Sequence, residues 1–263
     1  MSTSDDSTET RSGTGTYVYG IVPADVETNP DASGVGDPPG HVTTVRHNEI
    51  AALVSEIPVD HPLGTPEDLQ AHARLLDGSA GVAPVLPLRF GAVMTDTDAV
   101  TEELLSPNHD DFRAALDELE GQAQYVVKGR YAESAILNEV LTDNAEAARL
   151  RDEIRDKPED ASRPARIALG ELVGKAIDAK RDADTRSVLD ALEPLARAVS
   201  LRPPTHDLDA AHVAVLLDVA AQDDLEKTVA GLARDWEGRV EIRVLGPMAA
   251  YDFVMKREPE PEE

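Results

Sequence analysis

The chain has 263 residues, of which 51 are acidic and 25 are lysine or arginine, so its formal net charge at pH 7 is −26. A surface this acidic repels nucleic acid and anionic membranes, and the absence of cysteine excludes disulfides, thiol catalysis and thiolate metal sites. No apolar run approaches the roughly 20 residues that span a bilayer, and no signal peptide is visible, so we expect a cytoplasmic protein.

The first part of the chain predicts a polar leader followed by strands. Residues 1–15 contain no aliphatic side chain after Met1, so we expect them to be a disordered leader. A loop rich in proline and glycine, 23–40, separates the first strand from the next two. These strands are predicted at 17–22, 41–46 and 49–57.

A helix is predicted to begin after Thr65. Pro66 stands at its first position, and Asp68 comes three residues after Thr65, which is a capping box with aspartate in place of glutamate. The helix should run to about Leu76. The side chains expected on its inward face are Leu69, Ala73 and Leu76.

The next stretch, 84–94, is mostly apolar and alternates, which predicts a strand with two different faces. Pro87 cannot donate a ladder hydrogen bond, so we expect this strand at a sheet edge. Arg89 would point away from the face that carries Leu88 and Phe90. Two interpretations are open: a core strand whose arginine pairs with a carboxylate, or an exposed edge that docks another protein by strand addition.

These elements predict two domains of the α+β class. Residues 16–95 give three strands, a helix and a strand, which is a modified ferredoxin-like sandwich that lacks one helix. Two helices, 97–105 and 108–120, should form a bridge between the domains over 96–121. The apolar stripe expected on the second of them is Phe112, Ala115, Leu116 and Leu119.

Residues 122–255 predict the second domain. The order is strand, helices, strand, strand, helix, strand, which is the split βαβ order of a ferredoxin-like fold with a helical hairpin inserted at about 131–198. The stretch 175–186 is strongly charged, so we expect little of it to be buried and the hairpin to project. Residues 256–263 form a charged tail. The hairpin helices are predicted at 131–154 and 163–198, the strands at 124–128, 199–202, 211–219 and 239–245, and the last helix at 222–236.

No pattern in the chain indicates catalysis, a cofactor or a metal. His206 and His212 lie near two aspartates, but the prolines before them prevent a helical pair of metal ligands. The chain has no glycine-rich phosphate loop after a strand and no Gly-x-Ser-x-Gly motif. The apolar segment 246–254 either folds back over the core or offers a surface that grips a partner.

Three stretches carry a resemblance to a known family. They are Val85-Leu86-Pro87-Leu88-Arg89-Phe90-Gly91, the opening strand Tyr17-Val18-Tyr19-Gly20-Ile21-Val22, and the closing segment Leu245-Gly246-Pro247-Met248-Ala249-Ala250-Tyr251-Asp252-Phe253-Val254. With them the chain resembles the gas vesicle protein F/L family over roughly residues 16–255. The resemblance implies an N-terminal modified ferredoxin-like domain and a C-terminal α+β domain with a helical hairpin.

The resemblance also implies a function. Members are accessory or minor structural components of gas vesicle formation, found in the cytoplasm or in the vesicle, and they bind the small hydrophobic shell protein alongside other accessory proteins. The alternative from a different class is a ferredoxin-like regulatory module that binds a small ligand between its domains; an enzyme is disfavoured. The residues that we expect to contact a partner are Pro87, Leu88, Arg89, Phe90, Gly91, Tyr251 and Phe253.

Overall fold

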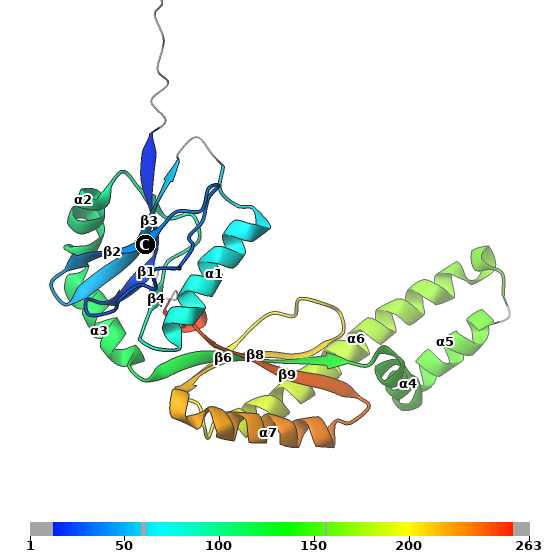
Figure 1. The fold of residues 1–263 in the computed structure, drawn as a ribbon. Helices are drawn as coiled ribbons and strands as arrows, with labels where there is room; N and C mark the ends of the chain where they lie inside the picture. The colour runs from blue at the N-terminus through cyan, green and yellow to red at the C-terminus, as the bar shows by residue number, and fades with distance from the viewer. Residues whose placement is uncertain (1–12, 59–61, 156, 255–263) are drawn as a thin grey trace, which may run out of the picture. The chain divides into compact units, whose positions relative to one another are not determined.

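Two antiparallel sheets, each accompanied by helices, make up the computed structural model, which describes residues 13–58, 62–155 and 157–254 (Figure 1). The chain divides into two units. The first comprises residues up to Gly121 together with those from Met248 onward, and the second is the continuous stretch Gln122–Pro247. The first unit is therefore discontinuous in sequence. Most of the predicted leader, 1–15, and all of the predicted tail, 256–263, lie outside the described residues.

The sheet of the first unit has the strand order β2-β3-β1-β4, and β5 also pairs with β1. The central strand β1 runs antiparallel to β3 from the pair Thr14↔Pro58 to the pair Pro23↔Ile50. Its side chains are buried on both faces, because helices and loops cover the sheet on either side. The strands are β1 (Thr14–Pro23), β2 (Val42–His47), β3 (Ile50–Pro58), β4 (Leu86–Pro87) and β5 (Val93–Met94).

The capping box predicted at Thr65 is present at the start of α1 (Pro66–Ala80). The inward face was predicted incorrectly, however, because Leu69 is 49% exposed. The face turned to the sheet instead carries Asp68, His72, Leu76 and Ala80. Two of these side chains are polar, and each is buried because it has hydrogen-bond partners on other elements.

The continuous strand predicted over 84–94 is wrong. Only β4 and β5 are extended, and both pair with β1, at Gly20↔Pro87 and at Tyr17↔Val93 respectively. Between them the chain turns, and Gly91 adopts a φ of +89°, a conformation that glycine reaches without the steric cost of a Cβ atom. The edge position expected from Pro87 is correct, because β4 ends the strand order.

The helices at 97–119 pack on β1, β2 and β3 of the first unit, although we had expected this segment to bridge two domains. The stripe predicted for α3 is present: Leu116 and Leu119 are buried, and Phe112 and Ala115 are half-buried. The elements are α2 (Thr97–Ala99), the π-helical turn η1 (Val100–Leu105) and α3 (His109–Leu119).

The sheet of the second unit has the order β7-β8-β6-β9. One face is covered by α6 and α7, whose side chains Val188, Leu192, Leu225 and Val229 pack on alternate residues of β6 and β8. The strands are β6 (Gln122–Tyr131), β7 (Ala198–Leu201), β8 (Asp209–Asp218) and β9 (Val240–Met248). The short η2 (Val219–Ala221) leads into α7 (Gln222–Asp235).

The helical insert contains α4 (Glu133–Asp143), α5 (Ala145–Arg155) and α6 (Glu159–Leu192). The single helix predicted over 131–154 is interrupted at Asn144, whose side chain accepts the amide hydrogens of Glu146 and Ala147 and so begins a new helix. Within this unit, α5 pairs with α6, and the two extend beyond the sheet (Figure 1).

The expectation that little of residues 175–186 can be buried is correct for the outer face of this stretch but wrong for the face that packs within the unit. Ile177 is only 8% exposed, and the neighbouring Lys180, Arg181 and Asp184 have side chains no more than 20% exposed. Charge alone therefore did not place this part of α6 in solvent, because its charged groups find partners on other elements of the same unit.

Candidate partner-binding surface

The turn that joins β4 to β5, residues Leu88–Gly91, carries most of the predicted contact residues, and we call it the β4 turn. It is closed by a hydrogen bond from the amide of Ala92 to the carbonyl of Arg89 at 3.3 Å. At its start the amide of Leu88 donates to the carbonyl of Tyr19 at 2.9 Å, which continues the pairing of β4 with β1. The turn is thus fixed to the central strand at its first residue.

A buried polar cluster holds the rest of the β4 turn. The amide of Gly91 donates to the hydroxyl of Tyr17 at 3.1 Å, and that hydroxyl lies 2.9 Å from Nδ1 of His72. The imidazole also hydrogen-bonds to the backbone of Leu88. The ring of Phe90 packs edge-on against Tyr17 and His72, with centroid separations of 5.9 and 5.5 Å. The start of the turn is therefore attached to His72 and its end to Tyr17, and these two side chains contact each other.

The electrostatics of this cluster keep it neutral at pH 7. Burial lowers the pKa of His72 below its ordinary 6.5, although the hydrogen bond to the Leu88 backbone opposes the shift. Burial raises the pKa of Tyr17 to about 12. A neutral imidazole can accept a hydrogen bond from the hydroxyl of Tyr17 at one ring nitrogen and donate a hydrogen bond to the Leu88 backbone from the other, as the two contacts require. The β4 turn is therefore held by hydrogen bonds without a net charge beneath it.

The closing segment of the chain packs on this same unit. The amide of Ala249 donates to the carboxylate of Asp77, on α1, at 3.1 Å, and Ala249 itself is fully buried. Burial raises the pKa of Asp77, partly offset by this hydrogen bond. Burial and then the Asp77 charge also raise the pKa of Tyr251. The short helix α8 (Tyr251–Val254) lies against β4.

The structure thus brings together residues that are far apart in the sequence. Phe90 and Tyr251 pack against the same hydrophobic core, and both remain half-buried. Pro87 is buried in β4, whereas Leu88 and Phe253 are half-buried. The predicted contact residues that are exposed are Arg89 and Gly91. Because β4 has only two residues and α8 packs beside it, a partner would meet this region through side chains rather than by adding a strand.

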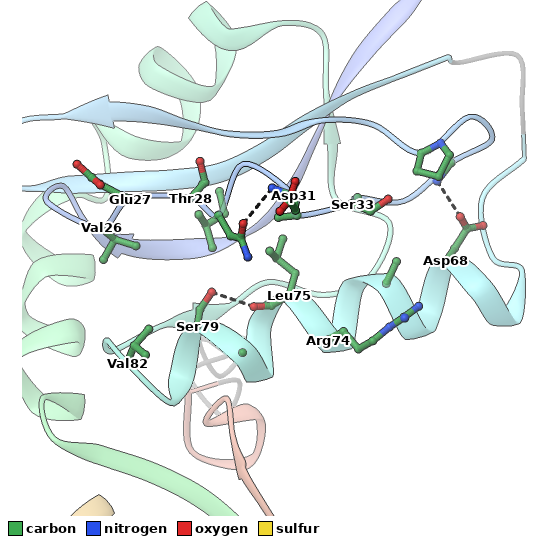
Figure 2. A pocket seen from close by; sticks show the side chains of 18 of the residues that line it. Val26, Glu27, Thr28, Asp31, Ser33, Asp68, Arg74, Leu75, Ser79 and Val82 are labelled. Carbon is green, nitrogen blue, oxygen red and sulfur yellow. Dashed lines mark hydrogen bonds between the residues drawn. The ribbon is translucent and has the colours of Figure 1, made fainter.

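A pocket of about 620 Å³ lies elsewhere in the first unit, between α1 and the loop that joins β1 to β2 (Figure 2). We call it the α1 groove. Its helical wall is a second face of α1, formed by Ala71, Leu75 and Gly78, with Val82 just beyond the end of the helix, and Leu75 points toward the loop (Figure 2). Sequence analysis missed this site, although the spacing i, i+4, i+7 of the small and apolar helical residues is a detectable signal.

The rim of the α1 groove is acidic. Glu27 and Asp31 come from the loop and Glu67 from the first turn of α1, and all three are exposed. Arg74, also exposed, is the cation among the residues that line the pocket. Asp68 lines it as well, but its carboxylate already accepts hydrogen bonds from the loop and from the helix cap. The exposed charges of the rim are therefore net negative.

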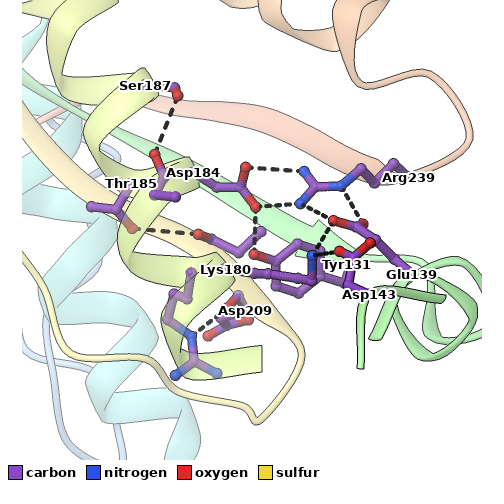
Figure 3. Close-up of polar contacts among 12 residues, drawn as sticks. Tyr131, Glu139, Asp143, Lys180, Asp184, Thr185, Ser187, Asp209 and Arg239 are labelled. Carbon is purple, nitrogen blue, oxygen red and sulfur yellow. Dashed lines mark hydrogen bonds and ion pairs between the residues drawn. The ribbon is translucent and has the colours of Figure 1, made fainter. Parts of the chain in front are cut away.

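In the second unit a polar cluster joins β6, α4 and α6 to Arg239, which directly precedes β9 (Figure 3). The guanidinium of Arg239 donates to Glu139 and Asp184 at 2.8 Å, and it lies over the ring of Tyr131, 5.3 Å from its centroid. Lys180 completes the cluster with a 2.6 Å contact to Glu139.

These contacts indicate a structural role for the cluster. Burial would raise the pKa of Glu139, but hydrogen bonds from Arg239 and Lys180 outweigh it and lower that pKa. Glu139 thus stays ionised and paired, so it is not suited to exchange protons near pH 7. The cluster connects segments that are distant in sequence.

The histidines considered for a metal have a structural explanation too. The carboxylate of Asp209 accepts the backbone amides of Thr205 and His206 at 2.7 and 3.0 Å and lies 3.3 Å from the ammonium of Lys128. His212 contacts the carbonyl of Pro203. Among the described residues no group of three or more His, Asp or Glu side chains is arranged to hold a metal ion. Nor is any described helix both long and apolar enough to cross a membrane.

Comparison with known proteins gives consistent matches over nearly the whole chain. Residues 15–255 match the sequence profile of the family described as "Gas vesicle synthesis protein GvpL/GvpF". The chain is 32% identical to gas vesicle protein F of Streptomyces sp. (strain CB03234), over 91% of this chain and 99% of that protein. It is 24% identical to gas vesicle protein F of Dolichospermum flosaquae, over 90% and 96% of the two chains.

Solved structures show the same fold. The crystal structure of GvpF from Anabaena sp. PCC7120 superposes with a TM-score of 0.74 at 22% sequence identity, covering 95% of this chain and 100% of that chain. GvpF from Microcystis aeruginosa gives a TM-score of 0.72, also at 22% identity. The fold is thus shared with proteins that differ from this one at most positions.

Proposed function

Because this chain belongs to the GvpL/GvpF family of gas vesicle synthesis proteins, we propose that it acts in gas vesicle formation as an accessory or minor structural protein that binds the hydrophobic shell protein. The observation that carries the proposal is the match over residues 15–255, because it covers both units rather than one shared module. The 32% identity to a gas vesicle protein F over almost its full length supports the same assignment.

The physical properties of the chain suit this role. A net charge of −26 keeps a protein soluble while it holds an apolar partner. We propose a cytoplasmic location and other gas vesicle proteins as further partners. We also propose that both units are ferredoxin-like, since numbering the strands within each unit gives the same order, 2-3-1-4. The alternative of a regulatory module for small ligands is not favoured by the relatives.

For the contact surface we propose the β4 turn with the adjoining α8. Arg89 is exposed at the tip of a turn whose backbone is held by Tyr17 and His72, so its position is fixed before a partner arrives. Phe90 and Tyr251 are half-buried and pack against the same hydrophobic core, so part of each aromatic side chain remains exposed. A cation flanked by aromatic surface is a frequent composition for the centre of a protein interface.

The experiment is co-purification of the shell protein with the tagged chain after co-expression. Arg89→Ala should leave folding intact and reduce the recovered shell protein. Arg46→Ala is the matched control, because Arg46 is also exposed in the first unit but lies on β2, at the opposite edge of the sheet. If Arg89→Ala recovers as much shell protein as Arg46→Ala, the β4 turn is not the contact. Absence of shell protein from the wild-type sample would overturn the function itself.

A further inference from the structure

We propose that the α1 groove is a second docking site, which receives the apolar face of an amphipathic helix with basic flanking residues from the shell protein. This inference rests on the proposed function, but it concerns a surface that is separate in its residues from the β4 turn. Three features lead to it: the two-faced character of α1, the occupied backbone donors of the facing loop, and the charge of the rim.

Helix α1 carries apolar residues on more surface than its own sheet covers. The face toward the sheet includes Leu76 and Ala80, as expected for a helix in a core. The second face, through Ala71 and Leu75, lines the groove, and these two side chains are only half-buried against the core. Val82 follows just after the helix ends, lines the same groove and is 86% exposed, so apolar surface remains available for another element.

The loop that forms the opposite wall of the groove determines which kind of secondary structure can bind there. In the loop, the amides of Asp31 and Ala32 both donate to Asn29, that of Gly34 to the carbonyl of Gly40, and that of Gly36 to Asp68. These donors are not available to pair with an extended peptide. An occupant that satisfies its own backbone hydrogen bonds fits this wall better, and a helix does so.

The floor and the rim of the groove indicate which side chains the bound helix should carry. The floor includes Leu53, which is 1% exposed, so an inserted side chain meets apolar surface. The rim carries Glu27, Asp31 and Glu67 against Arg74. Apolar residues at i, i+3 or i+4 and i+7, flanked by lysine or arginine, complement this pattern.

Gly78 provides a specific probe, because it lies on the groove face of α1 and a Cβ atom added there meets nothing within 4 Å. In Gly78→Leu the new side chain occupies the groove, while replacing a helical glycine should maintain or raise the melting temperature. Gly170→Leu is the matched control, because Gly170 is likewise an exposed helical glycine with open space, on α6 of the second unit.

The measurement is the molar ratio of shell protein to tagged chain after co-expression and purification, together with the melting temperature of each variant. Gly78→Leu should lower the ratio at least tenfold, and Gly170→Leu should stay within twofold of wild type. The triple variant Glu27→Gln, Asp31→Asn, Glu67→Gln should lower it several-fold and reduce its dependence on salt.

The possible outcomes separate the two proposals. If wild type recovers shell protein and Gly78→Leu recovers the same amount, the groove proposal is overturned and the proposed function stands. If wild type recovers none, the proposed function fails, and this inference fails with it. A clear fall in the melting temperature of Gly78→Leu would show that the chain itself fills the groove. A metabolite that stabilises wild type but not Gly78→Leu would assign the groove to a small ligand; either result overturns the proposal.

Discussion

Replacing Phe90 with alanine tests whether the β4 turn is held by packing beneath it. Complete burial of phenylalanine makes this substitution cost about 3–5 kcal/mol, and Phe90 is half-buried, which reduces the expectation to about 1.5–2.5 kcal/mol. The lost edge contacts with Tyr17 and His72 add about 0.5–1 kcal/mol. We therefore expect the free energy of unfolding to fall by about 2–3.5 kcal/mol.

In a chain of this size that loss corresponds to a melting temperature lower by roughly 4–14 °C. Scanning calorimetry measures the shift, and hydrogen exchange should show the loss of protection in β1 and β4 rather than in the second unit. Arg89→Ala is the control, because an exposed side chain at the same turn should change the stability by no more than about 0.5 kcal/mol. A Phe90→Ala protein that melts within a degree of wild type would refute the packing described for this turn.

Three further predictions concern other positions. Burial lowers the pKa of His72 below 6.5, so its contribution to the free energy of unfolding should be fully present above about pH 6.5 and be lost as the pH falls through the lower folded-state pKa. In His72→Gln the melting temperature should lose this part of its pH dependence, and equal slopes in the two proteins would contradict the assignment. Gly20→Ala should destabilise by more than about 2 kcal/mol in urea titrations, because its Cβ would lie 2.6 Å from the carbonyl oxygen of Leu86; wild-type stability would show that β1 and β4 can separate. Arg239→Met removes a half-buried cation from Asp184, and we expect thermal unfolding to report a loss of about 1–3 kcal/mol, whereas no loss would mean that the cluster contributes nothing net.

The elements that sequence predicted well are those fixed by local signals. Thr65, Pro66 and Asp68 lie within four positions of one another, and together they specify where α1 begins. The edge position of β4 likewise follows from one residue, Pro87, which has no amide hydrogen to donate. Such predictions hold because the interacting groups are close in the chain.

The elements that were predicted incorrectly depend on distant partners. His72 was not expected to face the sheet, because its hydrogen-bond partner Tyr17 is 55 residues away. Lys180 was expected in solvent for the same reason, since its partner Glu139 lies on another helix, 41 residues earlier. A single sequence gives the charge or polarity of a side chain, but not the partner that allows its burial.

The candidate site shows the same division. Arg89 and the residues beside it were proposed as contacts from the sequence, although their turn was predicted as a strand because the positive φ of Gly91 is not evident from an alternating pattern. The α1 groove was missed, because its second wall is a loop whose position follows from the fold. The helical half of the groove, from Ala71 to Gly78, could have been recognised from its spacing.

The discontinuous first unit has a consequence for the order in which the protein matures on the ribosome. Segment 122–247 is contiguous, so it can fold as soon as it emerges, whereas the core of the first unit is incomplete until Ala249 and Tyr251 arrive. Until then Asp77 lacks the amide of Ala249, and the apolar surface beneath that residue is uncovered. The unit that carries both proposed docking surfaces is thus completed last. A chain that ends before residue 249 should expose part of the apolar core of this unit, which is the kind of surface that chaperones and proteases bind.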